Sequence, residues 1–304
     1  MKIKILGNAF VNRKILEQEC EIVEEDPDYY ISDSFPPGGL PLEKLIYLTS
    51  EPPLCMPRIY YYSNFHKMPL VVRYGPKKEN EISVTINNSH GAEFPFSMQP
   101  FDCELITRED TTIKNRGVFY AGGLGLENNP SLFGSINIRK IRRQLVEYFQ
   151  EKDNCFVMGE GTKRGPDFTN ARLEKTREGK IQAIDKSGCD FVLAIENSFM
   201  EDYVTEKIGD GFTSDRVVLY LGASNIEKHV PLNCFIDLRP YVDWNTLNFD
   251  LEALQSKINS ITQEQYDEIL SNARTFRNDA YRKYQENMDD LTRRIIAFLK
   301  NLKK

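Results

Sequence analysis

Short apolar runs alternate with amphipathic helical stretches along most of the chain, and this alternation limits the folds that it can adopt. Strands that alternate with helices form βαβ units, in which helices cover a parallel sheet. A chain of 304 residues is also longer than one compact core usually organises. We therefore expect an α/β protein with two facing Rossmann-like domains, a cleft between them, and C-terminal helices.

The expected strands are short and mostly apolar. They lie at residues 1–6, 21–23, 28–32, 44–49, 117–121, 155–158, 189–195, 216–221 and 234–238. The expected helices lie at residues 12–20, 137–150, 172–187 and 203–212, and the chain after residue 247 is expected to be helical. Residues 70–110 carry polar and proline-rich patches, so we expect an irregular linker there.

Composition excludes several classes of protein. The net charge is −6, whereas a nucleic-acid binder normally carries a basic face. The three histidines have no spacing typical of a metal pair, and the six cysteines form no CxxC pair, so we expect buried reduced thiols and no metal site. No apolar run approaches the roughly 18 residues of a membrane span, and the start of the chain does not resemble a signal peptide. The expected location is the cytoplasm.

The last segment of the chain has one apolar helical face. Leu291, Ile295, Phe298 and Leu302 follow the helical period, with basic residues around them. We expect this helix, at residues 281–304, to dock on the rest of the protein. The alternative is a peripheral contact with an anionic membrane surface.

A polar stretch, ENSFMEDYVTEK at residues 196–207, directly follows the expected strand at 189–195. Ligands of parallel sheets bind beyond the carboxyl ends of the strands. With Asp202 as N-cap, a helix from Tyr203 would place Tyr203, Glu206 and Lys207 on one face. A lysine there can neutralise phosphate, and a carboxylate can accept hydrogen bonds from sugar hydroxyls. The stretch suits a nucleotide-sugar; its alternative is an ordinary solvated helix start.

The order of several short blocks resembles one enzyme family. FVLAIENS at residues 191–198 is followed by YVTEK at 203–207, by a strand that ends at Gly222, by Val230-Pro231, and by FID at 235–237. This run, about 50 residues long, resembles the donor-binding half of the α1,3/4-fucosyltransferases, which transfer L-fucose from GDP-fucose. The resemblance implies the GT-B arrangement of two Rossmann-like domains. It departs from the family at residues 214–218, SDRVV, before the strand that ends at Gly222.

The resemblance assigns donor-binding roles to single residues. In the family, the tyrosine, glutamate and lysine of Y-x-T-E-K bind the GDP-sugar. The matching residues are Tyr203, Glu206 and Lys207. Gly222, at the end of the following strand, belongs to the same implied donor site.

Further donor ligands follow from the same resemblance. Asn197 and Ser198 are expected to line the pocket, whereas Glu196 either lines it or braces the loop. The family also uses an arginine that opens the first helix of this domain, because a guanidinium can bind phosphate oxygens bidentately. Arg139 is the first choice for this role and Arg142 the second.

The resemblance places the catalytic base in the N-terminal domain. Glu51 stands at the carboxyl end of the expected strand at residues 44–49, before two prolines that fix its turn. Its surroundings lack the glycine and asparagine that are usual in the family, and a surface glutamate is the alternative. Glu206 is counted with Glu51 among the catalytic residues.

Two other motifs are weaker indications of a functional site. Asp26-Pro27-Asp28 has the form of a metal-binding D-x-D, but it lies far in sequence from the phosphate ligands and fits a turn better. Gly122, Gly123 and Gly125 form an incomplete dinucleotide motif. A loop near the acceptor or the phosphates is the modest interpretation of these glycines.

Together these features predict an inverting fucosyltransferase that moves L-fucose from GDP-fucose to an acceptor glycan, without a cofactor or an essential metal. The expected domains are an acceptor-side domain at residues 1–115, a donor domain at 116–280 and the amphipathic helix at 281–304. The alternatives are a transferase for another GDP-6-deoxysugar and an inactive glycan- or nucleotide-binding protein of the same fold.

Overall fold

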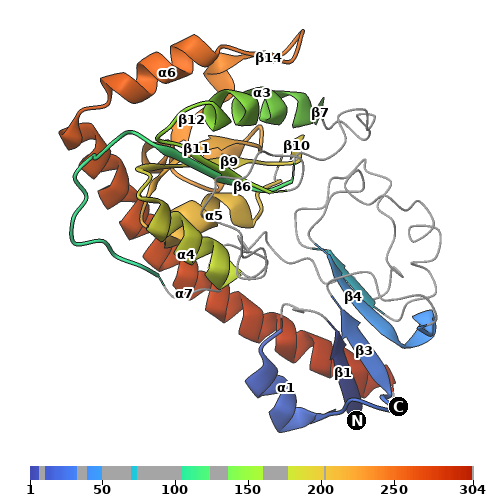
Figure 1. Ribbon diagram of the computed structural model, residues 1–304. Coiled ribbons are helices and arrows are strands. Elements are labelled where there is room, and N and C mark those ends of the chain that lie inside the picture. Colours follow the sequence, from blue (N-terminus) through green and yellow to red (C-terminus); the bar gives the residue numbers. More distant parts are fainter. Residues whose placement is uncertain are drawn as a thin grey trace. The chain divides into compact units, whose positions relative to one another are not determined.

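The chain forms two compact units (Figure 1). Unit 1 contains residues 1–97 and 282–304, and unit 2 contains residues 98–281. The computed structural model describes residues 1–6, 11–32, 40–49, 70–73, 105–123, 136–159, 177–201 and 203–302.

Unit 1 has a five-stranded parallel sheet with the order β2-β1-β3-β4-β5. Its strands are β1 (Lys2–Leu6), β2 (Glu21–Ile22), β3 (Tyr29–Ser32), β4 (Leu45–Thr49) and β5 (Leu70–Arg73). Helix α1 (Arg13–Glu19) connects β1 to β2, and the Asn12 side chain caps it by accepting from two backbone N–H groups. The strand β5 corrects the expectation of an irregular segment from residue 70, because its backbone extends the sheet at the edge of β4.

The C-terminal helix completes the core of unit 1. Helix α7 (Gln263–Leu302) is one continuous helix of 40 residues, so the structure shows no new element at residue 281. Its apolar residues Leu291, Ile295, Ile296 and Leu299 pack with the apolar residues of β1, β3 and β4. The Thr292 hydroxyl also accepts a 2.8 Å hydrogen bond from the Asn12 backbone N–H. The expected docking of the last helix is therefore confirmed.

Unit 2 has a second five-stranded parallel sheet, with the order β12-β11-β9-β6-β8. Its strands are β6 (Val118–Ala121), β8 (Phe156–Met158), β9 (Phe191–Ile195), β11 (Val217–Leu221) and β12 (Ile236–Asp237). In both units the second strand lies on one side of the first, and the other three lie on the opposite side. This order reverses direction between β6 and β9, which is the topological switch point of unit 2.

Helices cover both faces of the sheet of unit 2 (Figure 1). On one face lie α3 (Arg139–Gln150) and α6 (Leu251–Ser260), and on the other lie α4 (Arg177–Ser187) and α5 (Glu206–Thr213). The stripe Ile141, Leu145, Val146 and Phe149 forms the buried face of α3. The α/β class with two Rossmann-like units, as in a GT-B-like fold, is confirmed.

Smaller elements complete unit 2. Two antiparallel ribbons pair β7 (Ile136–Asn137) with β10 (Ser198–Phe199) and β13 (Val242–Asp243) with β14 (Asn248–Phe249). Short 3-10 helices in the two units lie at Leu42–Lys44, Ile226–Lys228, Leu232–Cys234 and Arg239–Tyr241. The expected strand at 234–238 is thus shorter, because Cys234 ends a 3-10 turn and only Ile236 and Asp237 pair with β11.

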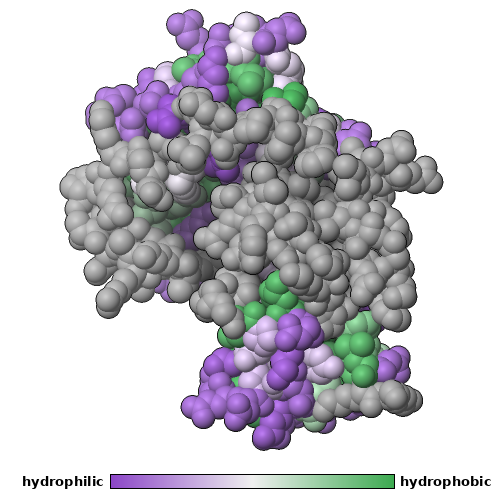
Figure 2. Space-filling model, turned by 90° about the vertical axis from the view of Figure 1, so that its right-hand side faces the viewer, coloured by the Kyte–Doolittle hydropathy of each residue, from purple (hydrophilic) through white to green (hydrophobic). Residues whose placement is uncertain are grey.

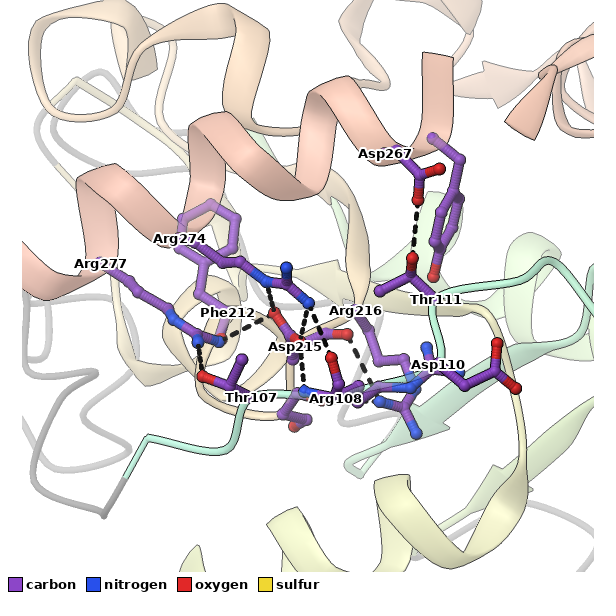
Figure 3. Close-up of polar contacts among 12 residues, drawn as sticks. Thr107, Arg108, Asp110, Thr111, Phe212, Asp215, Arg216, Asp267, Arg274 and Arg277 are labelled. Carbon is purple, nitrogen blue, oxygen red and sulfur yellow. Dashed lines mark hydrogen bonds and ion pairs between the residues drawn. The ribbon is translucent and has the colours of Figure 1, made fainter. Parts of the chain in front are cut away.

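An ion-pair cluster around Asp215 holds residues 263–281 of α7 within unit 2 (Figure 3). The Asp215 carboxylate accepts from Arg274 Nη2 at 2.6 Å, from Arg277 Nη1 at 3.1 Å and from the Arg108 backbone N–H at 2.7 Å. The Ile106 N–H also donates to the Thr213 carbonyl oxygen. Residues 105–115 therefore pack within unit 2. The sequence analysis placed them in the N-terminal domain instead, because it expected the boundary after residue 115.

Among the coloured residues on the face that Figure 2 shows, hydrophilic residues are the more numerous and hydrophobic ones form small patches. Among the described residues, Leu232 and Leu302 are the large hydrophobic side chains that are exposed. None of the described helices is long and apolar enough to cross a membrane.

Candidate functional site

A cavity of about 290 Å³ lies at the topological switch point of unit 2. Residues 119–123, from β6 and the turn after it, form part of its wall, together with apolar residues of β9. Its charged and amide-bearing lining residues are Arg142, Lys180, Asn197, Glu206 and Lys207. Ligands of doubly wound sheets bind at this place, beyond the carboxyl ends of the strands. We call it the switch-point cavity.

Helix α5 begins at Glu206, three residues later than expected, with Thr205 as its N-cap. Tyr203 therefore precedes the helix and does not share a helical face with Glu206 and Lys207. The Glu196 carboxylate accounts for the late start, because it accepts from the Thr205 N–H at 2.7 Å and from the Thr205 hydroxyl at 2.6 Å. Asp202, the expected N-cap, lies outside the described residues.

Glu196 braces the loop before α5. Its side chain is fully buried, and burial raises the pKa of the carboxyl group although the Lys207 charge opposes this. A Cβ atom on Gly222 would lie 2.3 Å from Glu196 Cγ, so the glycine lets β11 approach this side chain. Neither residue is among the described residues that line the switch-point cavity. The structure thus places Glu196 in the bracing role and Gly222 behind it.

Lys207 connects three oxygen-bearing side chains at the start of α5. Its Nζ lies 2.8 Å from Thr205 Oγ1, 3.1 Å from Glu206 Oε1 and 3.3 Å from Glu196 Oε2. Burial raises the pKa of Glu206, but the charges of Lys207 and Lys180 outweigh it and hold this pKa below its usual range. Glu206 is therefore ionised and can accept hydrogen bonds from ligand hydroxyl groups.

Arg142 lines the switch-point cavity from α3. Its guanidinium is buried and donates to the carbonyl oxygens of Gly123 and Ile195 and, at 2.7 Å, to Asn197 Oδ1. Its Nε atom is buried without a hydrogen-bond partner in the described structure. Arg139, one helical turn earlier and half-buried, is not among the described lining residues. Of the two expected arginines, the second choice is the one at the cavity.

Asn197 links Arg142 to the tyrosine of the YVTEK block. Its Nδ2 donates a 3.4 Å hydrogen bond to the Tyr203 hydroxyl, while its Oδ1 accepts from Arg142. Tyr203 is buried and lies behind the lining residue Asn197. Ser198 is also buried, in β10, where it pairs with Asn137 of β7. Asn197 thus lines the cavity, whereas Tyr203 and Ser198 support it.

Lys180 is a lining residue that the sequence motifs did not indicate. This lysine of α4 lines the cavity, and its Nζ lies 2.6 Å from the buried carboxylate of Asp210 on α5. A helical-face count over α4 could have found it, because Lys180, Ala183 and Ile184 stand at i, i+3 and i+4. Ala183 and Ile184 are buried in the core between α4 and the sheet. A lysine on a buried helical face needs a carboxylate or a ligand.

The other predicted residues lie elsewhere. Gly122 and Gly123 line the cavity, as the modest interpretation of the glycine motif allowed, whereas Glu51 and Gly125 lie outside the described residues. Asp26 lies in the bend before β3, and the Asp28 carboxylate accepts from the Lys2 backbone N–H. Within the described ranges, no group of three or more His, Cys, Asp and Glu residues could hold a metal ion.

The chemistry of the cavity is that of an anion site with one hydrogen-bond acceptor. Arg142 approaches from α3, whereas Lys180 and Lys207 approach from α4 and α5 on the opposite face of the sheet. Glu206, whose pKa the lysine charges hold below its usual range, lines the same cavity and forms an ion pair with Lys207. This arrangement fits a ligand that carries both phosphate and hydroxyl groups.

Comparisons with known proteins agree with this chemistry. The model of "Glycosyltransferase family 10 (fucosyltransferase) C-term" matches residues 132–290. An "Alpha-(1,4)-fucosyltransferase" of Arabidopsis thaliana is 51% identical over 47 residues, 16% of this chain and 12% of that protein. The human "4-galactosyl-N-acetylglucosaminide 3-alpha-L-fucosyltransferase 9" is 40% identical over 57 residues, 18% of this chain and 16% of its own length. The alignments thus span less than a fifth of these relatives.

A solved structure was matched over most of the chain. It is entitled "Crystal Structure of alpha1,3-Fucosyltransferase" and covers 89% of this chain and 80% of its own, at 16% identity and a TM-score of 0.49.

Proposed function

Since the chain belongs to glycosyltransferase family 10, the fucosyltransferase family, we propose that it transfers L-fucose from GDP-fucose to a hydroxyl group of an acceptor glycan. The observation that carries the proposal is the switch-point cavity. The charged and amide-bearing residues that line it, as far as the chain is described, all fall within the segment that matches the family. Cations and a carboxylate stand together there, as a sugar diphosphate requires.

The diphosphate would bind to the cations of the cavity. Arg142 takes the role that the resemblance gave first to Arg139, because Arg142 lines the cavity and Arg139 is not among the described lining residues. Lys207 adds an ammonium group at the start of α5. The N-terminal N–H groups of α5 add further positive potential, since Thr205 makes no side-chain cap.

Glu206 would bind hydroxyl groups of the donor. It remains ionised near neutral pH because the two lysines lower its pKa, and an ionised carboxylate only accepts hydrogen bonds. Asn197, which also lines the cavity, holds the Arg142 guanidinium in place, and Tyr203 supports Asn197 from behind. The donor site is therefore prearranged by contacts within unit 2.

Transfer would proceed with inversion. The acceptor hydroxyl attacks the anomeric carbon, the bond from that carbon to the diphosphate oxygen breaks, and GDP leaves with the electron pair. Glu51 remains the proposed base that takes the hydroxyl proton. Arg142 and Lys207 stabilise the charge that develops on the departing diphosphate, a task that metal ions perform in other enzymes. We therefore propose turnover without an essential metal.

Mass spectrometry of reaction products tests the proposal. The protein is incubated with GDP-fucose, other GDP-6-deoxysugars and a panel of glycan acceptors, with and without excess EDTA. We expect fucosylated product in both conditions. If product forms only with another GDP-6-deoxysugar, that sugar and not fucose is the one transferred. GDP binding without any turnover would indicate an inactive binding module. Loss of activity in EDTA that manganese restores would contradict metal-free transfer. The cytoplasmic location and the alternative membrane contact stay predictions.

A further inference from the structure

Lys180 has a place in the switch-point cavity that no family motif gives it. It belongs to α4, before the blocks that resemble the fucosyltransferases, and its side chain is 18% exposed. Its Nζ lies 2.6 Å from Asp210 Oδ2, and the Asp210 side chain is fully buried. The ammonium group is thus fixed at the border between the core and the cavity.

The ammonium group of Lys180 has more N–H donors than the hydrogen bonds described for it use. A lysine ammonium carries three N–H donors. In the part of the chain that the structure describes, the one hydrogen bond of Lys180 is to Asp210. The others can reach into the cavity that the residue lines. Lys180 and the Glu206 carboxylate line the same cavity.

The cations of the cavity come from both faces of the sheet. Arg142 reaches the switch point from α3, and Lys180 and Lys207 reach it from α4 and α5. A diphosphate at the ends of β6 and β9 would therefore have Arg142 on one side and Lys180 on the other. Lys207 already contacts Glu196 and Glu206, so Lys180 is the ammonium group with fewer carboxylate neighbours.

We propose that Lys180 is a further donor-site residue, which binds the diphosphate of the nucleotide-sugar from the α4 side while Asp210 holds it in position. This inference rests on the proposed function of the cavity. The competing explanation is structural: Lys180 would only neutralise the buried Asp210. A buried carboxylate that loses its partner is costly, so a single substitution cannot separate the two explanations.

Calorimetry on the full chain separates them with three variants. Lys180→Met removes the charge and keeps most of the side-chain length. Lys180→Met with Asp210→Asn also removes the buried charge that would be left unpaired. Lys186→Met, on the exposed side of the same helix, is the matched control. Each protein is titrated with GDP and with guanosine, which lacks the phosphates.

We expect both Lys180 variants to bind GDP about 10- to 100-fold more weakly, as for a lost charge-assisted contact, with guanosine affinity unchanged. The Lys186 variant should match the parent. Unchanged GDP affinity in Lys180→Met, restored GDP affinity in the double variant, or loss of guanosine together with GDP in both Lys180 variants would each overturn the inference. Absence of GDP binding by the parent would instead refute the proposed function.

Discussion

Asp215 and Arg277 form an ion pair of 3.1 Å in which both side chains are almost fully buried, with 1% and 2% exposed. The pair joins the turn after α5 to helix α7, and Arg274 adds a second guanidinium (Figure 3). Asp215 has a left-handed backbone with φ of 57°, a conformation that aspartate tolerates better than most residues. The carboxylate thus stabilises a turn and a helix contact at once.

Asp215→Asn should lower the free energy of unfolding by about 3–5 kcal/mol at neutral pH, because buried guanidinium groups lose their counter-ion. Burial raises the pKa of Asp215, but its arginine and backbone partners outweigh burial and lower it below 3.8. The ionised carboxylate therefore stabilises the fold above pH 3.8, and this contribution disappears as the pH falls further. Denaturant unfolding at several pH values should show the two proteins converging in acid. Asp267→Asn, at an exposed contact of α7 with Thr111, is the control.

Lys207→Ala should weaken the binding of GDP as well as of GDP-sugars. The lost charge-assisted contact corresponds to on the order of 1.5–3 kcal/mol of binding free energy. Isothermal titration calorimetry measures this, with the exposed Lys228→Ala as a matched control. Parent-like GDP affinity would remove Lys207 from the donor site.

The two arginines of α3 should respond differently to a charge-conserving change. Arg142→Lys loses the fork that bonds to Gly123, Ile195 and Asn197, so we expect GDP to bind at least tenfold more weakly. Arg139→Lys should bind GDP like the parent. The opposite ranking would return Arg139 to the role that the resemblance gave it.

The last turns of α7 should matter for stability. Ile295→Ala removes a side chain that is 1% exposed in the core of unit 1, so we expect a loss of about 2–5 kcal/mol in thermal or denaturant unfolding. Leu302→Ala, at a side chain that is 43% exposed, should change stability by less than about 0.5 kcal/mol. Binding of the parent to anionic vesicles, lost in Leu302→Ala, would revive the membrane alternative.

Glu51→Gln should slow the chemical step and spare donor affinity. The amide keeps the shape of the side chain but cannot accept the acceptor proton, and loss of a general base costs about 10²–10⁴-fold in rate. Single-turnover kinetics with saturating GDP-fucose measure this, and the pH profile should lose its low-pH limb. If Glu51→Gln retains the parental rate, the base must be sought among other acids.

The sequence predicted most strands of both sheets because most of them are short, mainly apolar runs. Phe191–Ile195, for example, is buried along its whole length, as the strands of a parallel sheet covered on both faces are. β5 was missed because four residues beside a long polar region give little periodicity. Short edge strands depend on the sheet that they join, and that sheet is not visible in the local pattern.

The site was predictable where local motifs form it and not where tertiary contacts do. Glu206, Lys207 and Asn197 stand in the blocks that resemble the family, and the structure brings them to one cavity. The predicted start of α5 was wrong, because the Thr205 N–H and hydroxyl donate hydrogen bonds to Glu196, nine residues earlier. The spacing within YVTEK does not reveal such a contact.

The helical face of Lys180 could have marked it as a residue that needs a partner, but it could not identify that partner. Asp210 is 30 residues away, on another helix. Their pairing becomes apparent only when α4 and α5 pack on the same face of the sheet. Charges that pair between two helices on one face of a sheet are therefore the part of a site that is hardest to find from a single sequence.

The continuous helix α7 makes the order of synthesis important for unit 1. The strands β1 to β4 emerge from the ribosome first, but Leu291, Ile295 and Leu299 of their core arrive about 240 residues later. At a synthesis rate of roughly 5–20 residues per second, the apolar face of this sheet stays without its covering helix for about 10–50 s. During this interval the nascent chain exposes apolar surface, and a chain that stops before α7 lacks the residues that complete the core of unit 1.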